Sequence, residues 1–206
     1  NYIIAVLTAI VELGWFGYQC GFFGSTIHAM FPNAGFITEP VVAGIWGGLL
    51  MMTTAFIGYK GLELLSNIAS PLILLTCVVA CGLAATRVGG MEQFNQITLA
   101  HTGSMSTAVG IVSVIGAYAM GAVLQPDLTR YGKKCSDSVI GAVFGFIIAN
   151  SFVIIAGFFI CTVADTSDVA VALLNILGSW SLLLLILAQW TTNDNNLYYS
   201  SLAAAA

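Results

Sequence analysis

A carboxylate, an indole and an amide lie at helical spacing in an apolar stretch near the start of the chain. Glu12, Trp15 and Gln19 are separated by three and four residues, so on an α-helix they share one face. A carboxylate inside lipid costs about 2.5–3.5 kcal/mol on insertion scales, which makes Glu12 a functional candidate. Hydrogen-bonding groups beside an aromatic plate suit a flat polar heterocycle. The competing interpretation is a carboxylate near a helix end, with Trp15 and Gln19 only packing.

A second polar cluster, "AQWTTNDNNLYYS", ends the apolar run "SLLLLILAQW". It places two threonines, three asparagines and an aspartate within residues 191–196. Hydroxyl and carbonyl oxygens are the ligands that a hard cation such as sodium requires, and buried amides can pair with the edge of a heterocycle. The alternative is a helix that has reached the membrane interface. The apolar and aromatic residues of "LYYSSLA" beyond the cluster favour a position inside a longer span.

Glycines and a proline mark the stretch "GAYAMGAVLQPD". Gly116 and Gly121 bracket Tyr118, and Pro126 follows. This pattern permits a broken membrane helix, and unwound backbone at mid-membrane depth is where transporters often bind substrate. Ordinary glycine-rich packing, with Pro126 ending the span, explains the same residues equally well.

The sequence lacks the patterns of an enzyme or a metal centre. Its five cysteines are scattered without paired spacing, and His28 and His101 each stand without an HExxH-like partner. No nucleophile with a nearby base and no phosphate-binding loop is recognisable. We therefore predict a protein that is not an enzyme and holds no cofactor, with no nucleic acid among its partners.

The composition is that of a membrane protein. Of 206 residues, 59% are hydrophobic and 7% are charged, against roughly 25% charged in soluble domains, and the mean hydropathy is +0.97. Apolar runs long enough to cross a bilayer predict an all-α polytopic membrane protein with six spans, at residues 2–29, 41–59, 62–86, 106–125, 138–164 and 177–203. The connections at residues 87–106 and 169–177 are long enough to hold short surface helices.

Positive charges orient these spans, because Lys and Arg in short loops are retained on the cytoplasmic side. Arg130, Lys133 and Lys134 place the loop after the fourth span inside, and by alternation Lys60 also lies inside. Only Arg87 opposes this arrangement. The first span is therefore expected to run from inside to outside.

Three stretches resemble the nucleobase–cation symporter family, which includes the purine and cytosine permeases: "GWFGYQ", "PDLTRYGKK" and "WTTNDNNLYYSSL". The resemblance covers the whole chain, from about the family's third helix to its eighth. It implies a fragment of a twelve-helix transporter whose first ten helices form inverted five-helix repeats, the symporter fold shared with amino-acid transporters. A third helix runs from inside to outside, in agreement with the charge pattern. Because the chain starts at Asn1 within an apolar run, we also expect an internal fragment.

The resemblance implies a substrate site residue by residue. Trp15 matches the tryptophan that stacks on the substrate ring, and Glu12 and Gln19 match substrate contacts on the same helix. Tyr118 matches a second aromatic plate in a broken helix, with Ala117 and Met120 beside it. Asn193 matches an asparagine near the substrate. Where this chain has Glu12 the cytosine permeases have glutamine, and Ala117 and Met120 replace serines; the carboxylate favours a substrate edge rich in N–H donors or itself carries a proton.

The resemblance also implies part of a sodium site. The backbone carbonyl of Ala188 and the hydroxyls of Thr191 and Thr192 match the family's cation ligands in the eighth helix. The first helix, which supplies the other half of that site, lies outside the chain. The coupling ion is accordingly expected to be sodium or a proton.

Together these inferences predict a multi-pass protein of the cell membrane that imports cytosine or a related nucleobase by cation symport. A first alternative is a proton-coupled carrier of another heterocycle, such as a purine, allantoin or a hydroxymethylpyrimidine. A second, of another class, is a membrane channel or sensor. The sequence leaves the oligomeric state open.

Overall fold

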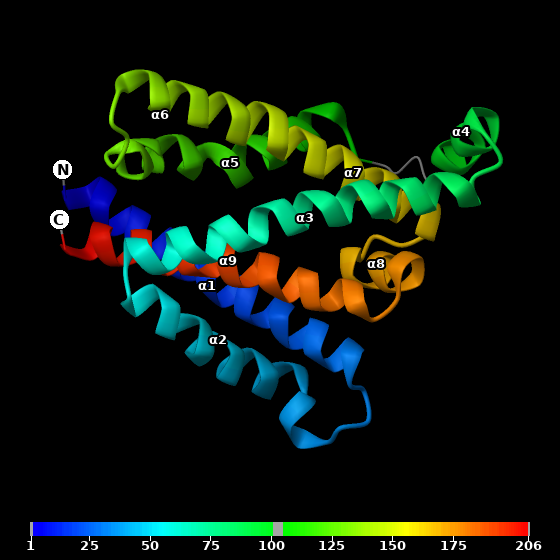
Figure 1. The fold of residues 1–206 in the computed structure, drawn as a ribbon, viewed down its shortest axis with the longest axis horizontal. Coiled ribbons are helices and arrows are strands. Elements are labelled where there is room, and N and C mark those ends of the chain that lie inside the picture. The colour runs from blue at the N-terminus through cyan, green and yellow to red at the C-terminus, as the bar shows by residue number, and fades with distance from the viewer. Residues whose placement is uncertain (1, 101–104, 206) are drawn as a thin grey trace.

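The chain forms an all-helical structure in which the long helices lie roughly lengthwise, side by side (Figure 1). The computed structural model describes residues 2–100 and 105–205, and the side chains of Met120 and Leu128 lie outside what it describes. The described helices are α1 (Tyr2–Met30), α2 (Pro40–Phe56), α3 (Tyr59–Arg87), α4 (Met91–Ala100), α5 (Thr107–Thr129), α6 (Cys135–Ala142), α7 (Asn150–Ala164), α8 (Val169–Leu177) and α9 (Trp180–Ala205). A 3₁₀ turn at Phe36–Thr38 precedes α2, and a π-helical segment at Val143–Ala149 joins α6 to α7.

Long helices occupy all six ranges that the sequence predicts as spans. Four of them are long and apolar enough to cross a membrane: Tyr2–Met30, Tyr59–Arg87, Thr107–Asp127 and Cys135–Ala164. The helix α2 is apolar but shorter, and in α9 the polar cluster interrupts the apolar run. Six spans, and their match to the family's third to eighth helices, stay a prediction.

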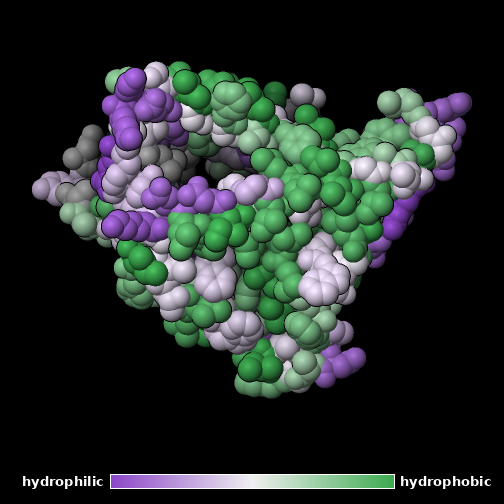
Figure 2. Space-filling view, in the orientation of Figure 1, coloured by the Kyte–Doolittle hydropathy of each residue, from purple (hydrophilic) through white to green (hydrophobic). Residues whose placement is uncertain are grey.

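The exposed surface fits a lipid environment. Figure 2 shows hydrophobic residues over most of the visible face, with hydrophilic residues gathered mainly at the end where both termini lie and at the outer end of α4. A soluble domain would bury most of these apolar side chains, whereas their exposure to apolar lipid tails costs no free energy.

The two predicted connections do hold short helices. The carboxylate of Asp168 caps α8 by accepting hydrogen bonds from the backbone N–H groups of Ala170 and Val171, at 2.8 and 3.3 Å. Gly178, at φ 80°, ends α8 in a conformation that favours glycine. The helix packs against α7, α9 and α3 and buries Leu173 and Ile176. It therefore anchors the start of α9.

The expected break in the fourth span is wrong for the described residues, since α5 is continuous from Thr107 to Thr129. Pro126 lies in its last turn, where the missing N–H removes one backbone hydrogen bond without ending the helix. Nothing lies within 4 Å of the position that a Cβ on Gly116 would take, so this glycine faces open space and not a closely packed helix. The irregular turn instead follows α6, as the π-helical segment.

The helix α9 lies at the centre of the packing, in contact with α1, α2, α3 and α8. Glycines let α1 and α2 approach closely: a Cβ on Gly44 would lie 2.8 Å from the carbonyl oxygen of Cys20. Beside this contact, one core cluster packs Phe23, Ile27 and Met51 against Trp190 of α9. These contacts determine which face of α9 meets each neighbour.

Candidate substrate cavity

A cavity of about 350 Å³ lies between α1, α5 and α9. We call it the central cavity. Its lining comprises Glu12, Trp15 and Gln19 of α1, Ala117, Tyr118, Gly121 and Leu124 of α5, and Thr192, Asn195, Asn196 and Tyr199 of α9. The structure thus brings together all three polar or aromatic residues predicted on α1 and two of those predicted on α5.

The α1 side of the cavity supplies hydrogen-bond acceptors without partners. Glu12 is only 4% exposed, and no described group donates a hydrogen bond to its carboxylate. The Oε1 atom of Gln19 is buried and also unpaired. Trp15 is 37% exposed and contacts Tyr18 edge to face, with ring centroids 5.7 Å apart. Because buried polar groups are normally satisfied, these unpaired acceptors make the α1 wall a candidate site for a ligand that carries donors.

The α5 side supplies a second aromatic ring. The hydroxyl of Tyr118 donates to Oδ1 of Asn150 on α7, at 3.3 Å, which ties the ring to the neighbouring helix. Ala117 precedes it in the lining and adds no polar atom from its side chain. The side chain of Met120 lies outside the described residues.

The α9 side combines Thr192, which the resemblance matches to a sodium ligand, with three residues that have no predicted role, Asn195, Asn196 and Tyr199. Thr192, Asn195, Asn196 and Tyr199 follow the i, i+3, i+4 and i+7 pattern of one helix face. The Nδ2 atom of Asn196 is buried without an acceptor. The i, i+3, i+4 and i+7 spacing that begins at Thr192 is visible in the sequence. It identifies the residues that face the cavity only once the orientation of α9 is known.

Asn193, which the resemblance matches to an asparagine near the substrate, does not line the central cavity, and its role in substrate binding stays a prediction. It is fully buried, and its Nδ2 atom lies 3.3 Å from both the Sγ atom of Cys20 and the Sδ atom of Met51. Successive residues of an α-helix differ by about 100° in direction, so Asn193 points between α1 and α2 while Thr192 faces the cavity.

The three residues predicted to bind sodium lie within one turn of α9. The carbonyl oxygen of Ala188 accepts hydrogen bonds from the hydroxyls of Thr191, at 2.8 Å, and Thr192, at 3.0 Å. These three oxygens are chemically suited to a hard cation, but by themselves they would supply only part of its coordination shell. In the described part of the chain, no group of three or more His, Cys, Asp or Glu side chains could hold a metal ion.

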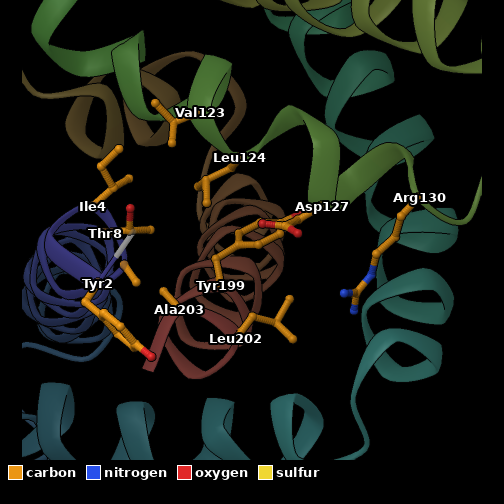
Figure 3. Close-up of a pocket in the computed structure, with 11 residues that line it drawn as sticks. Tyr2, Ile4, Thr8, Val123, Leu124, Asp127, Arg130, Tyr199, Leu202 and Ala203 are labelled. Carbon is orange, nitrogen blue, oxygen red and sulfur yellow. The ribbon is translucent and has the colours of Figure 1, made fainter. Parts of the chain in front are cut away.

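A second cavity, of about 440 Å³, continues along the same three helices toward the chain termini (Figure 3). Its labelled lining includes Thr8 of α1, Asp127 of α5 and Arg130 just beyond it. Leu124 and Tyr199, both buried, line this cavity and the central cavity alike. The two cavities are therefore neighbours, and these two side chains lie between them.

A cluster of tyrosines holds Arg130 at this end of the molecule. The Nη2 atom of Arg130 donates to the hydroxyls of Tyr131, at 2.7 Å, and Tyr198, at 3.0 Å, and these hydroxyls are 2.8 Å apart. The hydrogen bonds with Tyr198 and Arg130 lower the pKa of Tyr131 in the loop after α5. Tyr131 also stacks on Tyr59, with centroids 3.8 Å apart. The cluster joins the start of α3, the end of α5 and α9.

An all-helical membrane protein with a polar and aromatic cavity among its helices has the architecture of a solute carrier. The comparisons with known proteins define the class further. The whole chain, residues 1–206, matches the family described as "Permease for cytosine/purines, uracil, thiamine, allantoin", and the chain belongs to this family. It is 30% identical over 208 residues to the cytosine permeases of Escherichia coli strains K12 and O157:H7.

The alignment covers 100% of this chain and 48% of those relatives, so the chain spans about half the length of the curated relatives it matches. No solved structure matches it. The family confirms the resemblance noted in the sequence, and because its members are permeases it also confirms that the chain is not from an enzyme. The twelve-helix repeat architecture stays a prediction.

Proposed function

We propose that the whole protein imports cytosine or a related nucleobase across the cell membrane by symport with a cation. The observation that carries this proposal is the set of unpaired polar atoms around the central cavity. The Glu12 carboxylate and Gln19 Oε1 are free acceptors, and Asn196 Nδ2 is a free donor. An aminopyrimidine presents both N–H donors and ring acceptors along its edge, so it complements this set.

The aromatic residues support a flat substrate. Trp15 and Tyr118 come from different helices and both line the central cavity, so a heterocycle bound there contacts at least one ring face. Stacking on aromatic side chains contributes about 1–3 kcal/mol per base in nucleic-acid complexes. The ring faces provide affinity for any nucleobase, and the polar edges select among them.

For the coupling ion we propose sodium, bound by the Ala188 carbonyl and by the hydroxyls of Thr191 and Thr192, with further ligands from segments outside this chain. Thr192 also lines the central cavity, so the cation and the substrate would meet the same turn of α9. Binding of either ligand then favours the other, and this coupling is reciprocal. Proton coupling is the competing proposal, which the buried carboxylate of Glu12 favours.

The test is uptake of radiolabelled cytosine by the full-length protein, with uracil, adenine and hypoxanthine as competitors, in the presence and absence of sodium. We expect saturable uptake that cytosine competes for and that sodium stimulates. Uptake that survives sodium removal but collapses with the proton gradient would establish the proton-coupled alternative. A channel would conduct without saturating and show no counterflow exchange. If none of the four bases competes, a nucleobase substrate is excluded.

A further inference from the structure

The second cavity continues the lining of the central cavity along the same three helices. On α1, Thr8 precedes Glu12 by four residues, so the two side chains share one face and are about 6 Å apart along the helix axis. On α9, Tyr199 belongs to both linings, and Leu202 follows it by three residues. Each helix therefore presents one continuous face to both cavities, which are divided where Leu124 and Tyr199 lie between them.

Thr8 offers the second cavity a hydroxyl that has no partner among the described residues. The residue is 5% exposed and lines the cavity, but no described group forms a hydrogen bond with its Oγ1 atom. On the same helix, the hydroxyl of Thr26 donates to the backbone carbonyl of Phe22, one turn earlier, at 2.9 Å. Such a bond commonly satisfies a threonine within a helix. The free hydroxyl of Thr8 can instead donate to a ligand and accept from it.

Asp127 adds a carboxylate that does not pair with the cation nearest to it in sequence. Arg130 follows three residues later, a spacing that permits an ion pair on a helix, and both residues line the second cavity. The Nη2 atom of Arg130 instead donates to the hydroxyls of Tyr131 and Tyr198, at 2.7 and 3.0 Å. Within the described ranges, the half-buried carboxylate of Asp127 forms no hydrogen bond or ion pair. It is therefore a free acceptor for N–H groups.

Tyr199 places an aromatic ring beside these two polar groups. Figure 3 shows the side chains of Thr8, Asp127 and Tyr199 around the same space, from α1, α5 and α9. The volume of the second cavity is about 440 Å³, against about 350 Å³ for the central cavity. A flat ring that the central cavity can hold is therefore not excluded from the second cavity by its size.

The two cavities thus offer the same chemistry. The central cavity has the carboxylate of Glu12 with the rings of Trp15 and Tyr118, and the second cavity has the carboxylate of Asp127 with the ring of Tyr199. A carboxylate acceptor near an aromatic ring suits a flat solute that carries N–H donors. An anionic solute would be repelled by the carboxylate, and an apolar one would leave the polar groups unpaired.

We propose that the second cavity is a further binding site for the same class of nucleobase-like heterocycle, with Asp127 and Thr8 at its polar edge and the Tyr199 ring at its face. The proposal rests on the function proposed above. The substrate then moves from Glu12 toward Thr8, by about one turn of α1, and Leu124 and Tyr199 must move aside to let it pass. Because Asp127 and Thr8 do not line the central cavity, the two sites can be tested separately.

The experiment is equilibrium binding of radiolabelled cytosine to the purified full-length protein, analysed for the number of sites and their affinities. We expect two sites per chain in wild type. Asp127→Asn should weaken one site roughly 10- to 150-fold, and Thr8→Val should weaken the same site roughly 2- to 10-fold. Trp15→Ala should weaken the other site. Glu63→Gln is the matched control and should keep both sites, because this exposed carboxylate on α3 lines neither cavity.

The outcomes separate this proposal from the proposed function. The second site is overturned if wild type binds one cytosine per chain, or if Asp127→Asn and Thr8→Val both keep two sites of wild-type affinity. In either case cytosine still binds, and the proposed function stands. If wild type binds neither cytosine nor any of the three competitor bases, the proposed function fails and the second site fails with it. Thermal unfolding shows whether each variant is folded, and if Asp127→Asn is not, Thr8→Val decides.

Discussion

At the scale of single residues, two side chains that line the central cavity each carry a buried polar atom without a hydrogen-bond partner. These atoms are Gln19 Oε1 on α1 and Asn196 Nδ2 on α9. Leaving such groups unsatisfied costs about 1–3 kcal/mol each. A ligand that pairs with both would recover that cost on binding, so we expect these side chains to contribute to affinity and not to folding.

Trp15→Ala should weaken cytosine binding, because it removes the larger aromatic face of the cavity. Stacking of about 1–3 kcal/mol corresponds to a loss of roughly 5- to 150-fold in affinity. Equilibrium binding of labelled cytosine to the purified full-length protein measures the change, and Trp15→Phe, which retains a ring, should lose less. Wild-type affinity in the alanine variant would contradict the stacking role.

We expect substitutions of Asn196 and Asn193 in α9 to have different effects, one on binding and the other on stability. Asn196→Ala removes a free donor from the cavity, so it should weaken binding roughly 5- to 150-fold, for a loss of about 1–3 kcal/mol, without changing the unfolding temperature. Asn193→Ala removes a side chain packed between Cys20 and Met51, so it should lower the unfolding temperature and leave affinity unchanged. Binding and thermal unfolding of both variants are compared; the reverse pattern would place Asn193 in the site.

At the scale of helices, α9 presents a different chemistry to each neighbour. One face lines the central cavity through Thr192 and Asn196, and another meets α1 and α2 through Asn193. A third face meets α2 through Asp194 and Thr54. A rotation of α9 by one residue, about 100°, would exchange these roles. The close contact of α1 with α2 helps to prevent such a rotation, since both helices pack against α9.

Gly44→Ala tests this contact. The added Cβ would lie 2.8 Å from the backbone carbonyl oxygen of Cys20, so α1 and α2 must separate, with an expected cost of about 1–3 kcal/mol. Gly14→Ala is the matched control, because nothing lies within 4 Å of its Cβ position and alanine favours the helix. Thermal unfolding in detergent should show a lower midpoint for Gly44→Ala only. Equal stability of both variants would mean that the helices adjust without cost.

At the scale of the whole molecule, the two cavities lie in sequence along α1, α5 and α9, with Leu124 and Tyr199 between them. The cavity toward the termini is bordered by Arg130, next to the loop that the positive charges predict to be cytoplasmic. In a carrier of this orientation, the second cavity would be the cytoplasmic side of the substrate path, and the tyrosine cluster around Arg130 would help to hold that end together.

The native Cys135 offers a direct test of this orientation. It is the one exposed cysteine among the five and lies at the start of α6, beside Lys133 and Lys134. A membrane-impermeant maleimide should label it in inside-out vesicles and not in intact cells, and Cys135→Ser should abolish the labelling. Labelling in intact cells would reverse the assigned topology.

The sequence by itself determined the membrane character, the long helices and the shared face of Glu12, Trp15 and Gln19. All three depend on local composition and on the 3.6-residue period, which do not require a fold. The resemblance added α5 to this site through Ala117 and Tyr118, which do line the same cavity, but it wrongly led us to expect a break in α5.

Only the tertiary structure decided how the polar cluster of α9 is divided. The cluster places consecutive polar residues around the whole circumference of the helix, so its spacing alone favours no single face. Packing against α1 and α2 turns Asn193 and Asp194 inward, away from the cavity, and leaves Asn196 beside it. Helix rotation is set by long-range contacts between close-packed surfaces, and those contacts lie beyond the reach of any local pattern.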